Sequence, residues 1–120
     1  MAANFSSFLP LSPATLHILL SLAGEDRHGY GIMQEVARQS EGQYKLGPGT
    51  LYDNLQKLMT NGLVRETAAT RAAGTAGNDP RRRYYRLTPL GRSVLSAEID
   101  RLGSLVREAA VHLRPVPRRT

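Results

Sequence analysis

Residues 47–63, GPGTLYDNLQKLMTNGL, constrain the fold of this chain more than any other stretch. Pro48 suits the first turn of a helix, and Gly62 suits the position just past a helix end. Four apolar side chains between them share one helical stripe: Leu51, Leu55, Leu58 and Met59. The stretch is therefore predicted to form a short amphipathic helix that buries one face and exposes the other.

The exposed face of this helix carries small, amide, hydroxyl and cationic groups. Its residues are Gly49, Asp53, Gln56, Lys57 and Thr60, with Thr50 on the flank. Such groups hydrogen-bond base edges and phosphates of nucleic acids. Taken alone, the pattern is more typical of an ordinary surface helix, so the neighbouring segments have to decide its role.

The composition fits one soluble domain, and its positive charge alone is only weak evidence for a nucleic-acid partner. The chain has 120 residues and a net charge of +6, from 16 Lys and Arg against 10 Asp and Glu. All cations except Lys45 and Lys57 are Arg, whose planar guanidinium favours phosphate or guanine. Without Cys the chain has neither disulfides nor thiolate metal sites, and we expect no cofactor. The apolar run at 16–23 is too short to cross a membrane and follows no basic leader, so we expect a cytoplasmic protein without a membrane partner.

Two helices are predicted before the central one. A Ser-Pro start signal predicts a helix over about 13–23, and a second helix is expected over about 30–39, after a polar turn at 25–29. The first helix is apolar nearly all round, which indicates burial on two sides, the second of them in another subunit. His17 lies in this helix and is interpreted as structural, because no second metal-ligand residue follows it at helical spacing.

An arginine-rich hairpin is predicted directly after the central helix. Strands are expected at 63–67 and 81–87, joined by a flexible loop at 68–80 that is rich in Ala, Gly and Thr. From residue 62 to residue 92 there are seven Arg and only two acids, so positive charge gathers beside the central helix. A charge run is usually a solvated surface, but a basic hairpin in this position is typical of a wing beside a DNA-reading helix.

A long last helix is predicted over 88–113, with an apolar heptad seam. The seam residues are Leu95, Ile99, Leu102, Val106, Ala109 and Leu113. Packing on its own domain is the alternative, and it suits the first turns, where Leu90 and Val94 lie off the seam. The rest of the chain is too small to cover so long a stripe, so we expect pairing with a second copy, in which Leu16 and Leu20 of the first helix take part.

These elements, in this order, predict an α+β, mainly α fold. The fold is a winged helix-turn-helix with a long C-terminal dimerisation helix. A flexible N-terminal arm is expected at 1–9, and the DNA-binding winged helix-turn-helix at 10–87 with its wing hairpin at 63–87. The dimerisation helix follows at 88–113 and a disordered basic tail at 114–120.

Four stretches resemble the PadR-like transcriptional regulators of bacteria and occur in the order of that family. They are LSPATLHILLSLA (11–23), HGYGIMQEV (28–36), LGPGTLYDNLQKLMTNGLV (46–64) and RRRYYRLTPLGRSVL (81–95). The single C-terminal helix is similar to the short subgroup of the family. The resemblance implies a homodimeric repressor that binds an operator in double-stranded DNA. It also implies an aromatic small-molecule effector, since some relatives respond to phenolic acids or flat hydrophobic drugs bound at the dimer interface.

In this interpretation each subunit places the central helix in a major groove and the wing along the backbone or minor groove. Candidate contacts on and beside the helix are Tyr30, Lys45, Gly49, Thr50, Tyr52, Asp53, Asn54, Gln56 and Lys57. The wing would neutralise phosphates with Arg65, Arg71, Arg81, Arg82 and Arg83. The roles of two residues stay open. Tyr30 either donates a hydrogen bond to a phosphate or packs half-buried, and packing is slightly favoured. Asp53 either accepts a hydrogen bond from a cytosine amino group or holds a neighbouring Arg.

A different class of function is a winged-helix protein-interaction module that binds no operator. This alternative predicts little retardation of DNA at moderate salt, and the basic wing argues against it. An enzyme is not expected, because the chain has no Cys, no cluster of His with carboxylates and no phosphate-binding glycine motif after a strand.

Overall fold

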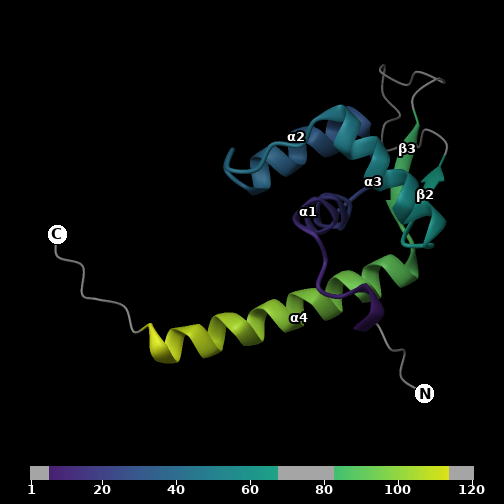
Figure 1. The fold of residues 1–120 in the computed structure, drawn as a ribbon. Coiled ribbons are helices and arrows are strands. Elements are labelled where there is room, and N and C mark those ends of the chain that lie inside the picture. The colour runs from purple at the N-terminus through teal and green to yellow at the C-terminus, as the bar shows by residue number, and fades with distance from the viewer. Residues whose placement is uncertain (1–5, 68–82, 114–120) are drawn as a thin grey trace.

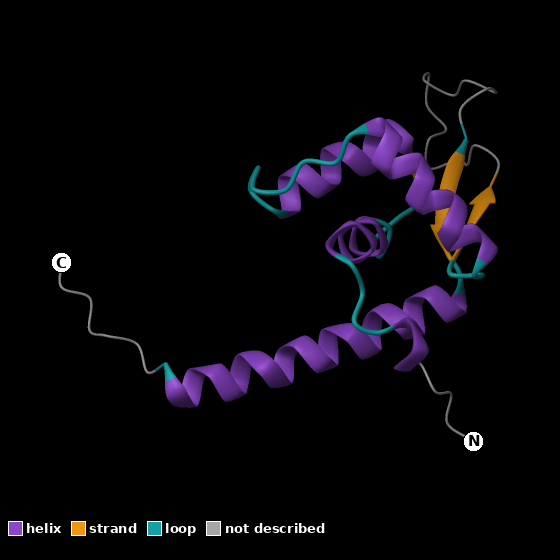
Figure 2. Cartoon of the chain, in the orientation of Figure 1, coloured by secondary structure: helices purple, strands orange, loops and turns teal. Residues whose placement is uncertain are grey.

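The computed structural model describes residues 6–67 and 83–113, which form a mainly helical body with a small sheet at one end (Figure 2). In chain order the elements are η1 (Ser6–Phe8), α1 (Pro13–Ser21), β1 (Arg27–His28), α2 (Gly29–Gln39), α3 (Pro48–Thr60), β2 (Val64–Thr67), β3 (Tyr84–Leu87) and α4 (Pro89–His112). The three strands pair in the antiparallel order β1-β3-β2. The mainly helical α+β class and the long C-terminal helix predicted from the sequence are confirmed.

Helix α1 lies at the centre of the core, with α2 and α3 on one side and α4 on the other (Figure 1). Ser12 caps its start, because the side-chain oxygen accepts a hydrogen bond from the N–H of Thr15 at 3.2 Å. Ile18 and Leu19 are completely buried. The helix ends at Ser21, slightly before the end predicted from the sequence. Helix α1 therefore contacts each of the other three helices.

The polar turn predicted at 25–29 contains a strand that the sequence did not reveal. Strand β1 consists of Arg27 and His28, which lie opposite Tyr85 and Tyr84 of β3. A strand of two residues is too short to show an alternation of apolar and polar side chains, and the strand that it pairs with lies far along the chain. The prediction of a plain turn is therefore wrong, and the wing is part of a three-stranded sheet.

Strands β2 and β3 form the predicted hairpin. Their register runs from Val64 opposite Leu87 to Thr67 opposite Tyr84. Val64 and Leu87 are buried and join the main core, so the base of the wing is fixed to the helical body. The predicted loop at 68–80 lies outside the described residues.

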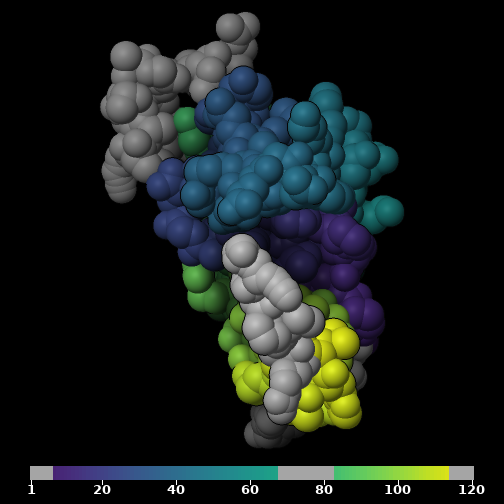
Figure 3. Space-filling view, turned by 90° about the vertical axis from the view of Figure 1, so that its left-hand side faces the viewer, coloured from purple at the N-terminus to yellow at the C-terminus, as the bar shows by residue number. Residues whose placement is uncertain are grey.

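Helix α4 changes character along its length. Its first turns pack against α1 and β3, and Val94 is completely buried. All residues over 104–113 are exposed, and this part projects past the other helices (Figure 1) as the yellow end below the body (Figure 3). The predicted seam therefore divides: Leu95 belongs to the core of its own subunit, whereas Val106 and Leu113 face the solvent.

A buried carboxylate ties the N-terminal segment to α4. Glu98 is 1% exposed and accepts a hydrogen bond from the backbone N–H of Leu11 at 3.0 Å. Arg101 donates to the same carboxylate from Nε and Nη2, at 2.6 and 2.9 Å. The hydrogen bonds from Arg101, helped by that of Leu11, lower the pKa of Glu98, although burial raises it. The segment that leads into α1 is thereby held against α4.

Replacing Glu98 with glutamine is expected to lower the free energy of unfolding by about 1.5–3 kcal/mol at neutral pH, because charge-assisted hydrogen bonds are lost. The folded-state pKa of Glu98 lies below its unfolded value. Its contribution is therefore fully present above the unfolded pKa and is lost as the pH falls through the folded-state pKa. Urea denaturation should show the difference between wild type and Glu98→Gln shrinking on acidification.

The matched control for this experiment is Asp100→Asn. It removes an exposed carboxylate from the same helix and is expected to leave the stability nearly unchanged. An equal loss in both variants, or a loss in Glu98→Gln that does not depend on pH, would contradict the role given to Glu98.

Candidate nucleic-acid interface

Helix α3 has the ends that the sequence predicted. Pro48 occupies its first turn. At its other end the N–H groups of Gly62 and Leu63 donate to the carbonyls of Met59 and Leu58, at 3.1 and 2.9 Å. Gly62 has a φ of 78°, the left-handed conformation expected for the residue that follows a helix. This compact turn leads from α3 into β2 and so sets the wing directly beside the helix.

The two faces of α3 also match the prediction. Leu51, Leu55 and Leu58 are buried. The exposed candidates of the helix are Gly49, Thr50, Tyr52, Asp53, Gln56 and Lys57. Within the residues that the structure describes, the side chains of Asp53, Gln56 and Lys57 make no hydrogen bond or ion pair. Their donors and acceptors are therefore available to a ligand.

Asn54 differs from the other candidates, because its side chain is already bonded inside the protein. Its Nδ2 donates to the carbonyl of Thr50 at 2.8 Å, and its Oδ1 accepts from the hydroxyl of Thr15 at 3.4 Å. Thr15 belongs to α1, so the amide joins the two helices. The sequence suggested a contact with bases or sugar-phosphate, whereas the structure places Asn54 on the flank of α3, at its junction with α1.

Two exposed tyrosines lie where α2 begins beside α3. Tyr30 is 63% exposed and Tyr52 is 49% exposed, so the half-buried packing role weighed for Tyr30 does not fit. The Tyr52 ring lies against Gly29, where a Cβ atom would overlap the tyrosine hydroxyl. A side chain larger than glycine at position 29 would displace the Tyr52 ring, so this contact sets the position of Tyr52 beside the start of α2. Lys45, just before α3, is exposed as well.

The wing strands hold some of their cations in ion pairs. Arg65 is exposed on β2, whereas Arg83 pairs with Glu66 at 3.2 Å. Arg86 lies opposite Arg65 and donates to both carboxylate oxygens of Asp26, at 2.8 Å from Nη2 and 3.1 Å from Nε. Asp26 thereby offsets the repulsion between two arginines that face each other across the sheet. The other wing candidates lie outside the described residues: Arg71, Arg81 and Arg82.

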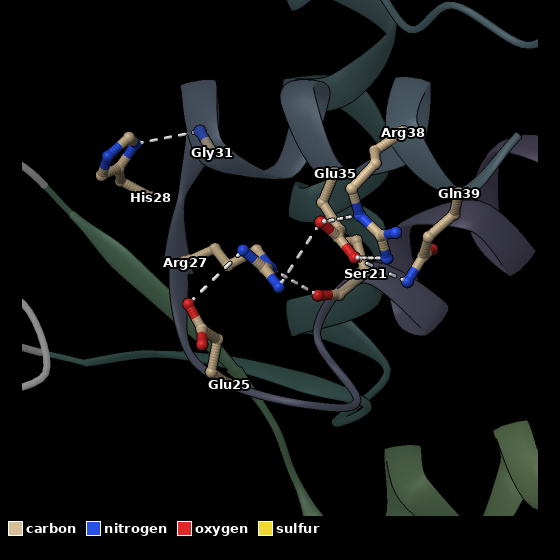
Figure 4. A network of polar contacts seen from close by, with 8 residues as sticks. All are labelled: Ser21, Glu25, Arg27, His28, Gly31, Glu35, Arg38 and Gln39. Atoms are coloured by element: carbon tan, nitrogen blue, oxygen red, sulfur yellow. Dashed lines mark hydrogen bonds and ion pairs between the residues drawn. The ribbon is translucent and has the colours of Figure 1, made fainter. Parts of the chain in front are cut away.

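A cluster of polar contacts joins the turn before α2 to the end of α1 (Figure 4). Arg27 donates from Nε to the carbonyl of Ser21 at 2.7 Å, and its Nη atoms pair with Glu25 and Glu35 at 3.4 and 3.7 Å. Hydrogen bonding from Arg38 lowers the pKa of Glu35 despite its burial, and the charge of Arg27 lowers it further. The cluster holds β1, and with it the base of the wing, against α1 and α2. Ser21, Arg27 and Glu35 belong to three different elements, so sequence spacing does not predict the contacts between them.

Other kinds of site have little support in residues 6–67 and 83–113. No group of three or more His, Cys, Asp or Glu side chains in these ranges is placed to hold a metal ion. His17 stacks on Tyr44 with ring centroids 4.5 Å apart, which agrees with a structural role. None of the helices described has both the length and the apolar character of a membrane span. The exposed face of α3 and its basic neighbours are therefore the candidate site.

Comparison with known proteins decides the family. The family described as "Transcriptional regulator PadR-like family" matches residues 18–97, from the middle of α1 into α4. The chain belongs to the PadR-like family of transcriptional regulators. This PadR-like regulator is 38% identical to Transcriptional regulator Rv3488 of Mycobacterium tuberculosis over 93 residues, which cover 78% of each chain. Family membership confirms the resemblance and the prediction that the chain is not an enzyme.

Solved structures share the fold of this PadR-like regulator. A PadR-like transcriptional regulator from Bacillus cereus superimposes with a TM-score of 0.68 at 18% identity, covering 93% of this chain and 97% of the other. Bacillus subtilis PadR, solved in complex with operator DNA, superimposes with a TM-score of 0.61 at 20% identity, covering 75% of this chain and 48% of the other. The predicted winged helix-turn-helix is thus confirmed as the fold.

Proposed function

We propose that this PadR-like regulator is a homodimeric repressor that binds an operator in double-stranded DNA. The observation that carries the proposal is the exposed face of α3, where Asp53, Gln56 and Lys57 have no partner among the described residues. Arg65 is exposed on β2, the strand that follows α3, and adds a cation of the kind that contacts phosphates. Helix α3 then lies in the major groove and the wing along the backbone or minor groove.

The second half of α4 supports the homodimer. Ile99, Val106 and Leu113 are 44%, 67% and 72% exposed, although all three are apolar and share the predicted seam. Pairing with a second copy would bury this stripe and so stabilise the pair. Leu16 and Leu20 of α1 are only partly buried and are proposed to join the interface. Two copies would then read half-sites about one helical turn apart.

The proposal also includes repression through the operator and its relief by a small molecule. Operator DNA is the ligand in the solved complex of Bacillus subtilis PadR, which has the same fold, and this supports an operator as the partner here. We further propose that an aromatic small molecule releases the operator, as the resemblance to the family implies. The protein-interaction module is the competing function, and it is separated from repression by whether the chain retains DNA.

The test is to incubate the purified full chain with fragmented genomic DNA and to sequence the fragments that it retains. We expect discrete fragments that contain paired half-sites, and a reporter placed behind such a fragment should be repressed by the protein. Repeating the selection with aromatic acids and planar drugs tests the effector. Failure to retain any DNA at moderate salt would overturn the proposal in favour of the protein-interaction module.

Replacing Lys57 with alanine is expected to weaken binding to every DNA sequence, because an exposed ammonium on the flank of α3 neutralises a phosphate. Each lost phosphate contact flattens the plot of log K against log salt by about 0.9, so a dimer should lose about two units of slope. Fluorescence anisotropy on the selected duplex measures the slope. Arg107→Ala, which removes an exposed cation from α4, is the control. A Lys57→Ala slope equal to that of wild type would exclude the phosphate contact.

A further inference from the structure

A recess lies between the N-terminal segment, the start of α1 and the second half of α3. Leucine side chains, among them the buried Leu58 and Leu63, form its apolar floor. Its polar lining consists of Ser7, Ser12, Thr15, Asn54, Lys57 and Asn61. The lining holds hydroxyl, amide and ammonium groups and no carboxylate, so the recess favours an anion.

Three polar side chains of the lining are bonded to one another. The hydroxyl of Ser12 donates to that of Thr15 at 3.1 Å, and Thr15 donates in turn to Oδ1 of Asn54 at 3.4 Å. These contacts fix the start of α1 against α3. The wall of the recess is thus built in advance of any ligand.

The other three polar side chains of the lining have no partner within the described ranges. Ser7, Lys57 and Asn61 are exposed, and their side chains make no hydrogen bond or ion pair within the residues that the structure describes. They come from two segments, since Ser7 belongs to η1 while Lys57 and Asn61 belong to α3 and its C-cap. The mouth therefore presents a hydroxyl, an ammonium and an amide that can all donate to an oxyanion.

The mouth of the recess lies on one flank of α3. At about 100° per residue, Asp53 and Gln56 lie at the centre of the exposed face, with Tyr52 on one flank and Lys57 and Asn61 on the other. The Tyr52 flank faces the start of α2, where its hydroxyl meets Gly29. A helix that lies along a major groove has a phosphate ridge on either side. The two flanks of α3 therefore face the two different DNA strands.

We propose that the mouth of this recess binds a backbone phosphate of the strand on the Lys57 side, an inference that rests on the proposed operator binding. The phosphodiester accepts from Lys57 and Asn61 of α3 and from Ser7 of the N-terminal segment. The hydrogen bond from Leu11 to Glu98 holds this segment in place, so the second wall of the site depends on α4. Tyr30 and Tyr52 contact the opposite DNA strand. Contacts on both flanks of α3 then fix the rotation of the helix about its own axis in the major groove.

The test places a carboxylate at the mouth by two independent substitutions, Ser7→Glu and Asn61→Asp. Each is expected to weaken binding of the duplex selected from genomic DNA about tenfold or more, because the carboxylate faces a phosphate. Ser104→Glu adds the same charge to the exposed part of α4 and should change the affinity less than about twofold. Circular dichroism melts of all three variants show that the fold is retained.

Ethylation interference gives a second readout. In wild type, neutralising one phosphate per half-site on the Lys57 side should impair binding, whereas in Ser7→Glu the same ethylation should improve it by removing the repulsion. If wild type binds the duplex and both variants bind it equally well, or if the interference pattern is unchanged, the phosphate site is refuted while operator binding stands. If wild type binds no duplex, the proposed function fails and the site fails with it.

Discussion

Replacing Gly91 with alanine is expected to lower the free energy of unfolding by about 3 kcal/mol. A Cβ atom at this position in α4 would overlap the carbonyl oxygen of Leu63 and crowd its carbonyl carbon. Both are backbone atoms in the turn between α3 and β2, so no side-chain rotation relieves the clash. The helix must instead move away from the base of the wing.

That movement would break further contacts at the same corner. The N–H of Thr88 donates to the carbonyl of Leu63 at 3.1 Å, and the Thr88 hydroxyl donates to the carbonyl of Gly62 at 2.6 Å. Thr88 also caps α4 by accepting from the N–H of Gly91 at 2.9 Å. One methyl group would therefore disturb a helix cap and the junction of α3 with the wing together.

Gly103→Ala is the matched control, because it makes the same change in the same helix. Its nearest neighbour would be the Nη1 atom of Arg107 at 3.5 Å, which is the mobile end of a flexible side chain. Alanine should therefore be neutral there or stabilise by up to about 1 kcal/mol, through its better helix propensity. Urea denaturation of the two variants gives the comparison. Equal stability of Gly91→Ala and Gly103→Ala would contradict the prediction, because it would show that the contact of α4 with the turn between α3 and β2 accommodates the added methyl group.

The features predicted from the sequence are those with local causes. The cap at Ser12 and the left-handed Gly62 follow from residue types that suit one backbone conformation, whatever lies elsewhere in the chain. The buried stripe of α3 follows from the helical period alone. These local signals were enough to order the helices and to place the exposed face of α3.

The features that sequence reasoning missed depend on contacts between distant residues. Strand β1 exists because Arg27 and His28 pair with β3, and Arg86 is held by Asp26, which is 60 residues away in sequence. Glu98 is buried because the N–H that it accepts from lies 87 residues earlier. The spacing of residues in the sequence does not reveal such distant partners. In the sequence, Glu98 therefore looks the same as the exposed charged residues around it in α4.

The candidate site was predicted better for α3 than for its surroundings. Gln56 and Lys57 are exposed, as the helical period requires. Asn54 and Arg83, however, are already bonded to Thr15 and Glu66, and a linear pattern does not reveal competition of this kind. Helical position thus identifies which side chains can reach a ligand, whereas their availability depends on the tertiary structure.

Replacing Val106 with glutamate is expected to convert the proposed dimer into monomers and to lower the affinity for the operator about a hundredfold or more. Val106 is 67% exposed in the single subunit, so the substitution should leave the fold of the monomer intact. In a symmetric pair the change occurs in both copies, and two carboxylates would have to leave water at one apolar seam. Loss of the pair leaves each half-site to be bound alone, without the gain in effective concentration that linkage provides.

Ser104→Glu separates the effect of the seam from that of charge. Ser104 is exposed on the same part of α4 but lies about 160° from Val106 around the helix, so a glutamate carboxylate there stays in water in the dimer. Sedimentation at micromolar concentration should give a dimer for wild type and Ser104→Glu and a monomer for Val106→Glu, and anisotropy on the selected duplex should rank the affinities in the same way. A dimeric Val106→Glu would place the interface elsewhere on the molecule. A monomeric wild type that still bound the operator tightly would show that one exposed face of α3 and its wing suffice.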